Sequence, residues 1–427
     1  MTEPQSLDGL VALGSALQKQ EKYAQAAETF AAALGLEPAR TDLKKTLLHC
    51  LELDARTSVQ RGDFRAAAAA YRQIIGIVPR NAGMRMLLGN ALYRAGDLEA
   101  AEAALAAALE TEPDNLQALA SAAVVAKALG RPSMTFLARI LKSVNDNPKY
   151  ITMKMWAALE SGDPERAFSF DVEGLNVMRW RAFDSLYRQQ DLQARLKALP
   201  ALAGTLPHQT PRPLLYAGGD GNYAARFAQG LIASALEKCP GADFHFHVMN
   251  PGAFQPRDAF KDFPKDRLTW TTEAMGPVDK ILFAPRRWLR LAQIQYHVER
   301  TIILVDTDSI INGDITKALP DDFDIVLYDR SDDPWLHQTI NGAFLAVAPT
   351  GRDFTDFLAA YILHFEEAGI PKWFDDQFNM VSARAWFTRK VPSLRIRYCS
   401  RHMMDWSGSQ RPESLIWHAK GHLKEKT

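Results

Sequence analysis

Cysteine is scarce in this chain, with three residues, Cys50, Cys239 and Cys399, among 427. They are scattered and lack Cys-x-x-Cys spacing, so the sequence indicates neither a disulfide framework nor a cysteine-bound zinc site. An excess of charge is also missing, because 50 basic residues balance 50 acidic ones, which argues against a nucleic-acid-binding surface. No apolar stretch approaches the length of a membrane span, and the N-terminus lacks the pattern of a signal peptide. We therefore expect a cytoplasmic protein of about two or three domains, with no transmembrane segment and no nucleic-acid partner.

Alanine and leucine dominate the chain from Leu7 onward, and small, aromatic and helix-ending residues recur among them. The first such unit ends at Pro38, and the interval from Pro79 to Pro113 is 34 residues (113 − 79 = 34). The pattern resembles the tetratricopeptide repeat, in which small residues let two antiparallel helices approach closely. The resemblance implies that residues 1–170 form a helical solenoid whose concave face binds a protein or peptide. A solenoid with a purely architectural role is the alternative.

Prolines between Leu199 and Pro213 mark the end of the repeats, since proline at this density cannot continue a helix. We expect residues 171–212 to form a helical connector that ends in a proline-rich linker. From residue 213 to residue 427, apolar strands alternate with amphipathic helices, which is typical of an α/β domain. The predicted fold class is therefore α plus α/β, an N-terminal solenoid followed by a domain with a mixed or parallel sheet.

The strand expected at residues 301–305 is apolar and is followed at once by two carboxylates, Asp306 and Asp308. Open α/β sheets bind ligands beyond the carboxyl ends of their strands, and residues two apart in extended chain point to the same side. Like charges so close repel each other, so the pattern favours a divalent metal ion that bridges to an anionic ligand. The alternative is that the pair caps a helix or solvates a turn.

Other polar residues lie near the ends of predicted elements in the same domain. Asp220 and Asn222 lie in a glycine-rich turn between a strand and a helix, where backbone can approach a nucleotide. A tight turn without a ligand is the alternative there. In the helix expected at residues 286–296, Arg290 would reach toward the strand ends and bind phosphate, whereas Arg287 would lie on the solvated face.

Six short motifs occur here in the order of a known enzyme family. They are Gly219-Asp220-Gly221-Asn222-Tyr223, Trp288-Leu289-Arg290-Leu291, Leu304-Val305-Asp306-Thr307-Asp308, Asn341-Gly342-Ala343, Asp376-Gln377-Phe378-Asn379 and His418-Ala419-Lys420-Gly421-His422-Leu423-Lys424. With these motifs, residues 213–427 resemble a GT-A-fold glycosyltransferase, most closely the retaining family that contains glycogenin and bacterial lipooligosaccharide galactosyltransferases. One departure is that Lys424 is followed by Glu425, where the family often has proline and tryptophan.

The resemblance implies a role for each matching residue. Asp306, Asp308 and His418 would hold Mn²⁺, with Mg²⁺ as the alternative. The donor, implied to be a UDP-linked sugar, would contact Asp220, Asn222, Arg290, Asp329, Asn341, Gly342, Gly421 and Lys424. Asp376 and Gln377 would be the catalytic residues, because their oxygens would stabilise the cation-like sugar of the transition state.

The predicted activity is therefore hexosyl transfer from a nucleotide-sugar to a glycan, a lipid-linked glycan or a protein, with retention of configuration. Front-face attack and a covalent intermediate both remain open as routes to retention. The repeats would dock the acceptor or a partner protein. The alternative hypothesis is a tetratricopeptide scaffold whose transferase-like domain is catalytically degenerate and binds a nucleotide or nothing.

Overall fold

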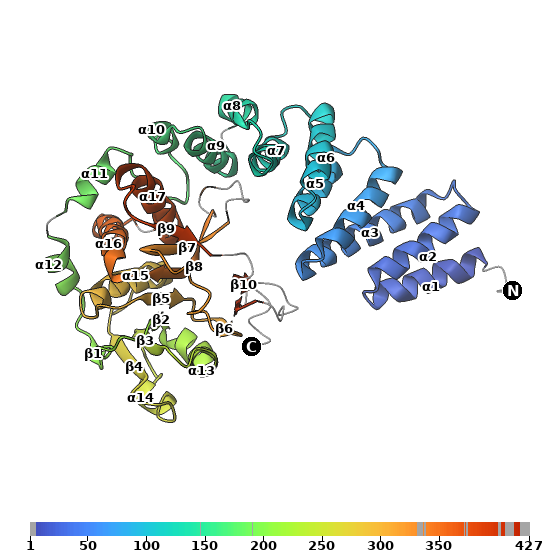
Figure 1. The fold of residues 1–427 in the computed structure, drawn as a ribbon. Coiled ribbons are helices and arrows are strands. Elements are labelled where there is room, and N and C mark those ends of the chain that lie inside the picture. Colours follow the sequence, from blue (N-terminus) through green and yellow to red (C-terminus); the bar gives the residue numbers. More distant parts are fainter. Residues whose placement is uncertain are drawn as a thin grey trace. The chain divides into compact units, whose positions relative to one another are not determined.

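The computed structural model describes residues 6–145, 147–189, 191–330, 336, 339–370, 372, 375–399, 403–405 and 414–418, without the side chains of Lys149, Asp375 and Asp376. The chain divides between Val144 and Asn145 into two compact units. In the described residues the first unit is helical and the second is built around a sheet, and each has a hydrophobic core of its own (Figure 1).

Eight helices make up the described part of the first unit, and neighbours in the chain pack against each other. They are α1 (Leu7–Lys19), α2 (Tyr23–Leu36), α3 (Thr41–Arg61), α4 (Phe64–Ile77), α5 (Ala82–Ala95), α6 (Leu98–Thr111), α7 (Leu116–Ala128) and α8 (Met134–Lys142). The helices α4, α5 and α7 begin after Asp63, Asn81 and Asn115, whose side chains each accept a hydrogen bond from a backbone N–H of the first turn. The longer interval between Pro38 and Pro79 is taken up by α3, which at 21 residues exceeds its neighbours.

Small residues lie where paired helices of the first unit approach most closely. Gly89 of α5 faces α6, and a Cβ added there would lie 2.6 Å from Leu105 Cγ and 3.2 Å from the carbonyl oxygen of Ala101. In the first pair, a Cβ on Gly14 would lie 2.9 Å from the ring of Phe30. Both glycines are therefore required by the close approach of two helices, as the repeat pattern predicts.

We expect Gly89→Ala to lower the free energy of unfolding of the first unit by about 1–3 kcal/mol, because the added methyl group overpacks the contact between α5 and α6. Gly76→Ala in α4 is the matched control, since nothing lies within 4 Å of a Cβ added there. The control is expected to raise stability by about 0.5–1 kcal/mol, because alanine favours the helix more than glycine does. Urea titration of the full chain, followed by circular dichroism, measures both changes; effects of the same sign would contradict the packing argument.

The second unit alternates helices with strands after a run of short helices. Its helices are α9 (Pro148–Glu160), α10 (Pro164–Ala167), α11 (Ala182–Tyr187), α12 (Leu192–Lys197), α13 (Gly221–Lys238), α14 (Pro256–Ala259), α15 (Phe283–Gln295), α16 (Arg352–Glu367) and α17 (Asp375–Lys390). Its strands are β1 (Ala203–Gly204), β2 (Leu214–Asp220), β3 (Asp243–Met249), β4 (Leu268–Glu273), β5 (Ile302–Val305), β6 (Ser309–Ile311), β7 (Ile325–Asp329), β8 (Ile340–Val347), β9 (Ile396–Tyr398), β10 (Met404–Asp405) and β11 (Ile416–His418).

Eight of the described strands form one mixed sheet, in the order β1-β4-β3-β2-β5-β8-β7-β9. Strands β4, β3, β2 and β5 run parallel, whereas β8 is antiparallel to both β5 and β7. Helix α13 covers one face of the sheet, and α15 and α16 lie on the other (Figure 1). Alternate side chains of β2 point to opposite faces of the sheet. Leu215 and Ala217 pack in the core with α13, while the Tyr216 hydroxyl donates to the carbonyl oxygen of Arg287 in α15. With the helical repeats before it, this mixed sheet confirms the α plus α/β fold class.

The segment expected as a connector, residues 171–212, packs on the helices of the second unit. Trp386 Nε1 donates to Asp184 at 2.9 Å, and the Tyr361 hydroxyl donates to the carbonyl oxygen of Asn176 at 2.5 Å. Strand β1 lies in the same segment and pairs with β4. Helices α9 and α10, which the sequence placed before a boundary at residue 170, also belong to the second unit. The structural division therefore falls earlier in the chain than the boundary expected from the repeat pattern.

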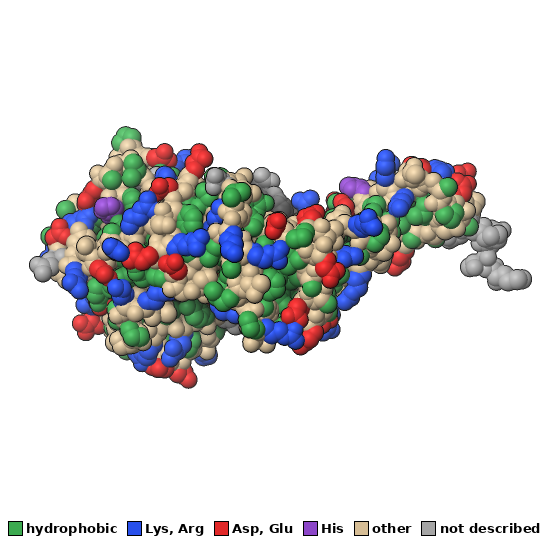
Figure 2. Space-filling model, turned by 90° about the horizontal axis from the view of Figure 1, so that it is seen from above, with side chains coloured by type: hydrophobic (Ala, Val, Ile, Leu, Met, Phe, Trp, Pro, Cys, Tyr) green, Lys and Arg blue, Asp and Glu red, His purple; other side chains and the backbone are tan. Residues whose placement is uncertain are grey.

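Charged side chains of both signs are interspersed on the face that Figure 2 shows, in line with the equal numbers of basic and acidic residues. Among the described helices, none is both long enough and apolar enough to cross a lipid bilayer. Buried apolar residues are instead gathered in the separate cores of the two units.

Candidate functional site

The strand order in the sheet of the second unit reverses at β2. From β2 the chain adds β3 and β4 on one side of this strand, and it then places β5 on the other side. β2 lies between β3 and β5 and runs parallel to both, so the carboxyl ends of β2 and β5 meet at one edge. Open α/β sheets bind ligands at such a point, because the diverging connections leave a crevice there. Asp220 ends β2, and Asp306 directly follows β5. This edge therefore has the topology of a ligand-binding crevice.

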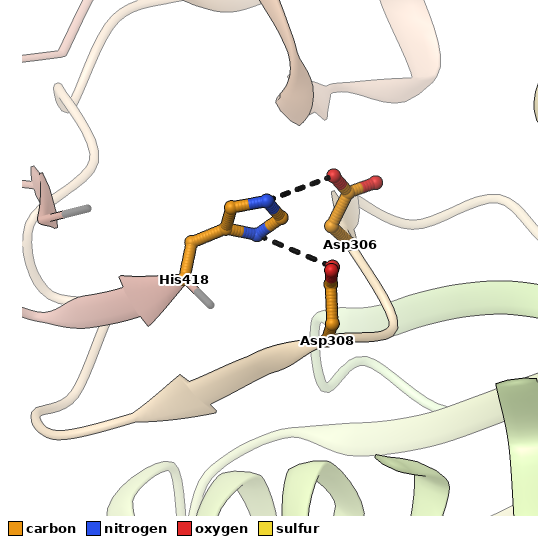
Figure 3. A group of neighbouring side chains, drawn as sticks. All are labelled: Asp306, Asp308 and His418. Carbon is orange, nitrogen blue, oxygen red and sulfur yellow. Dashed lines mark ion pairs between the residues drawn. The ribbon is translucent and has the colours of Figure 1, made fainter. Parts of the chain in front are cut away.

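Asp306 and Asp308 leave this edge in the short loop between β5 and β6 (Figure 3). The backbone N–H of Asp306 donates to the carbonyl oxygen of Ala343 at 3.1 Å, which holds the start of the loop on β8. Between the aspartates, the Thr307 hydroxyl donates to the carbonyl oxygen of Gly218 in β2 at 3.0 Å. Thr307 is thereby fixed to the sheet, which leaves the two carboxylates to face the crevice together, as their spacing predicts.

His418 reaches the two carboxylates from a strand far along the chain. Strand β11 pairs antiparallel with β6, and the register places His418 opposite Ser309. The imidazole points at both aspartates (Figure 3): Nδ1 lies 3.4 Å from Asp308 Oδ1, and Nε2 lies 3.7 Å from Asp306 Oδ2. One ligand atom from each of the three residues lies within 4.8 Å of the others. The structure thus brings together the three side chains predicted as metal ligands.

Two further side chains hold the remaining oxygens of the aspartates. The Tyr223 hydroxyl, in the first turn of α13, donates to Asp308 Oδ2 at 2.6 Å. Burial and the charge of Asp308 raise the pKa of Tyr223, so its phenol keeps the proton that it donates. Arg287 of α15 pairs with Asp306 Oδ1 and donates to the carbonyl oxygen of Gly342 in β8 at 3.0 Å. Sequence reasoning gave neither residue a role at the carboxylates.

Arg287 and Arg290 lie in surroundings that differ from those expected. The expectation that Arg287 faces solvent is wrong, because its residue is 8% exposed and its guanidinium contacts Asp306. Arg290 is 1% exposed, pairs with Glu273 of β4 and donates to the carbonyl oxygen of Pro200 at 2.7 Å. Helix α15 is buried around nearly its whole circumference, so it offers its arginines no solvated face. A signal was present in the sequence, because arginines on a buried helix need carboxylate partners.

Asp220 and Asn222 lie in the turn between β2 and α13. Asp220 Oδ1 accepts hydrogen bonds from the backbone N–H groups of Asn222 and Tyr223, at 2.9 and 3.2 Å, and so caps the helix. The Asn222 side chain is exposed. The turn requires glycine at position 221, because a Cβ on Gly221 would lie 2.2 Å from the carbonyl oxygen of Pro251. The backbone is thus a tight, capped turn, and contact of these residues with a base or ribose stays a prediction.

The other predicted residues come from β7, β8 and α17. Asn341 and Gly342 lie at the start of β8, where the Asn341 side chain accepts from the backbone N–H two residues later, at 2.7 Å. Asp329 ends β7 at the same edge of the sheet and pairs with Arg384 at 3.4 Å. Gln377 is half-buried in the first turn of α17. The side chain of Asp376 lies outside the described residues, as do Gly421 and Lys424.

Two stretches of the chain match the family model of the tetratricopeptide repeat, residues 10–44 and 58–128. The predicted repeats are confirmed there. No curated protein matches the chain. Among solved structures, the apo structure of WbbM, a bifunctional glycosyltransferase, is similar at 11% identity and a TM-score of 0.39, over 52% of this chain and 48% of that chain. MamA from Desulfovibrio magneticus RS-1, from residue 41 to its end, is similar at 18% identity and a TM-score of 0.23, over 33% of this chain and 75% of that chain.

This chain therefore spans about half the length of the WbbM chain. Both TM-scores are below 0.5, so these likenesses carry no argument about the second unit.

The charges around the carboxylates decide what the site can hold. Asp306 and Asp308 together with Arg287 leave one net negative charge when His418 is neutral, as a metal ligand must be. A divalent cation bound between the ligands would turn this into one net positive charge, which attracts an anion such as a diphosphate. Two carboxylates and one imidazole also form a donor set that suits Mn²⁺. The residues present therefore fit the predicted cation.

Proposed function

We propose that the second unit is a metal-dependent glycosyltransferase of the GT-A type, which moves a sugar from a nucleotide-sugar to an acceptor. The observation that carries the proposal is the convergence of Asp306, Asp308 and His418 at the switch point of the sheet. A turn or a helix cap would use the two aspartates alone. It would not explain why β11 directs His418 toward both aspartates. This histidine lies opposite Ser309 of β6, from which it is 109 residues away in sequence.

In this proposal Asp306, Asp308 and His418 hold Mn²⁺, and Mg²⁺ is the alternative. The ion would supply a Lewis acid for the diphosphate leaving group, on which negative charge develops as the bond to the sugar breaks. Asp308 is 5% exposed and His418 is 5% exposed, so these ligands lie in a region where water screens charge weakly. In this proposal, two of the three metal ligands would therefore be shielded from bulk solvent.

The donor, a UDP-sugar in this proposal, lies along the edge formed by the ends of β2, β5 and β7 and the start of β8. The residues assigned to it are Asp220, Asn222, Asp329, Asn341 and Gly342, with Gln377 and Asp376 beside the reacting sugar and Gly421 and Lys424 at the diphosphate. Arg290 is left out of this assignment, because Glu273 and the carbonyl oxygen of Pro200 already engage its guanidinium. Transfer proceeds with retention, by front-face attack or through a covalent intermediate.

The first unit supplies the second part of the proposal. Tetratricopeptide repeats bind proteins and peptides along a concave helical surface, so we assign the docking of the acceptor or of a partner protein to residues 10–44 and 58–128. The acceptor classes that this allows are a protein, a glycan and a lipid-linked glycan. A repeat domain of this kind would raise the local concentration of acceptor beside the transferase.

A nucleotide-release assay on the full chain tests the proposed function. We expect at least one donor from a panel of UDP-sugars and other nucleotide-sugars to be hydrolysed or transferred in the presence of Mn²⁺, and EDTA to abolish the release. Calorimetry with UDP, with and without Mn²⁺, separates this function from the scaffold alternative. No release from any donor, together with no metal-dependent binding of UDP, would favour a scaffold with a degenerate transferase-like domain.

A further inference from the structure

The first unit has a pocket of about 510 Å³ between two neighbouring helix pairs. Helix α4, the C-terminal end of α5 and the turn into α6 line it, and all of these lining residues lie within residues 58–128, which match the repeat model. Helix α4 packs against α5, so one packed group of helices forms the walls (Figure 1). Ligand pockets usually measure about 300–1,000 Å³, so this one can accept a few side chains of a partner.

Two arginines of α4, Arg65 and Arg72, line this pocket. Both are exposed, and in the part of the chain that the structure describes neither forms a side-chain hydrogen bond, an ion pair or a cation–π contact. Elsewhere in the same unit, Arg131 pairs with Glu102. Residues seven apart share one face of a helix, and these two are separated by about 10 Å along its axis. The pocket therefore presents two guanidinium groups whose donors are free.

The stability of α4 does not explain the arginine at its start. Arg65 lies in the first turn of the helix, where the helix dipole favours a negative side chain over a positive one. The nearby Asp63 caps the helix, because its carboxylate accepts from the backbone N–H of Ala66 at 3.0 Å. Among the described residues it pairs with neither arginine of the pocket. The fold of the repeat therefore does not require a cation at this position.

Apolar groups lie between the two arginines. Ala68 follows Arg65 by three residues on the same face of α4 and is 1% exposed, and Leu92 of α5 is 4% exposed. Among the described lining residues, Asp97 is the only acidic one; it is exposed, and its side chain makes no cap hydrogen bond at the start of α6. The lining thus carries two positive charges and one negative charge around an apolar base, which favours an anionic partner.

We propose that this pocket docks an acidic segment of a partner protein, in which two carboxylates pair with Arg65 and Arg72 and an apolar side chain between them packs on Ala68 and Leu92. The inference rests on the docking role proposed for the first unit, and it adds the chemical class of the partner. Guanidinium groups bind carboxylates through charge-assisted, often paired hydrogen bonds. In a polyproline II helix, residues three apart lie on one side and about 9 Å from each other, which matches the spacing of the arginines. We therefore expect two acidic residues three positions apart.

Selection from a phage-displayed library of short random peptides, with the full chain as bait, tests the inference. We expect the selected peptides to be enriched in pairs of acidic residues three positions apart. They are then synthesised with a C-terminal amide, so that only side chains supply carboxylates, and their binding is measured by calorimetry. Binding should weaken as the NaCl concentration rises, because salt screens charge pairs near the surface.

Arg65→Gln and Arg72→Gln each remove one guanidinium and keep a side chain that favours the helix. We expect each to weaken binding of the selected peptides by about 5- to 10-fold, the effect of losing one charged contact that is partly exposed. Arg56→Gln is the matched control, since Arg56 is an exposed arginine of α3 outside the pocket, and it should bind with full affinity. The double variant Arg65→Glu with Arg72→Glu should lose these peptides and bind versions in which lysine replaces the acidic residues. Circular dichroism verifies that each variant folds.

The outcomes separate the inference from the docking role on which it rests. Peptides that are not enriched in acidic residues, or that bind Arg65→Gln and Arg72→Gln as tightly as the unmodified chain, would overturn the acidic partner and leave the docking role in place. If the library yields no binding peptide, the docking role itself is wrong and the inference falls with it, whereas the proposed transferase activity is untouched. Acidic peptides that both variants weaken, and that Arg56→Gln does not, establish the inference.

Discussion

Asp308→Asn is expected to lower the rate of Mn²⁺-dependent nucleotide release by about 10³-fold. A metal ion contributes several kcal/mol to stabilising charge on a leaving group, and about 4 kcal/mol corresponds to a factor of this size in rate. Asparagine has nearly the same shape and still accepts from the Tyr223 hydroxyl, which now donates to Asp308 at 2.6 Å. The substitution therefore removes the ligand charge and leaves the packing around it in place.

The rate is measured with saturating donor over a range of Mn²⁺ concentrations. Asp262→Asn is the control, because Asp262 is an exposed aspartate in the same unit. We expect the control to keep the activity of the unmodified chain, and Asp308→Asn to regain part of its activity only at high Mn²⁺. Equal activity of the two variants would remove Asp308 from the site and with it the central observation of the proposed function.

Arg290→Ala is expected to lower the free energy of unfolding by about 3–5 kcal/mol, the usual cost of removing one partner of a buried ion pair. The Glu273 side chain is fully buried, and the substitution removes the guanidinium that pairs with it most closely, which leaves Arg286 Nε at 3.8 Å. The role assigned to Arg290 from the sequence, a contact with the donor, predicts a different result. A donor contact at the surface of a crevice would raise the KM of a protein whose stability is unchanged.

Urea titration of Arg290→Ala, of Glu273→Met and of the double variant Arg290→Met with Glu273→Met measures the effect. We expect the double variant to lose less stability than Arg290→Ala, because a pair of apolar side chains leaves no unpaired charge in the interior. A near-normal urea midpoint for Arg290→Ala, with a raised KM for the donor, would restore the role that the sequence assigned.

The pH dependence of stability gives a second measurement on the same network. Burial alone would raise the pKa of Glu273, but hydrogen bonds from His247 and Arg290 outweigh it and lower the pKa from 4.5 to about 2. The unfolded chain then takes up a proton more readily than the folded one, so this stabilisation is present above about pH 4.5 and is lost as the pH falls toward 2. Arg290→Ala should flatten the dependence in this window, because it removes one of the groups that lower the pKa.

The proximity of Asp306, Asp308 and His418 could be predicted from the sequence, because all three belong to short motifs that resemble those of one enzyme family. Asp306 and Asp308 follow an apolar strand, and the motif that begins at His418 supplied the histidine although it is distant in sequence. The histidines of β3 are buried against threonines of β4: His245 Nδ1 lies 2.8 Å from the Thr269 hydroxyl, and His247 Nδ1 lies 3.1 Å from that of Thr271. The local sequence pattern was sufficient to place a residue such as Asp306, whose position follows directly from the strand that precedes it.

The arginines of α15 could not be assigned in this way. Periodicity tells which residues of a helix share a face, but a helix buried on nearly all sides has no face that stands out as solvated. Whether Arg287 or Arg290 meets the carboxylates depends on the rotation of α15 relative to β5, and that is set by packing against the sheet and α16. The same limit applies to the segment expected as a connector, residues 171–212. Its contacts with the second unit, from Asp184 to α17 and from Asn176 to α16, are made with residues far along the chain, which local composition does not indicate.

The pairing of β11 with β6 also determines when the site can exist during synthesis of the chain. A ribosome that has just added Ser309 must add a further 109 residues before the histidine that will face it has been made. Throughout that interval both aspartates are already present, and the guanidinium of Arg287, made before them, is available as their counter-ion. We therefore expect a nascent chain to shape this loop around its own arginine, and to take up a metal ion only after β11 has paired with β6.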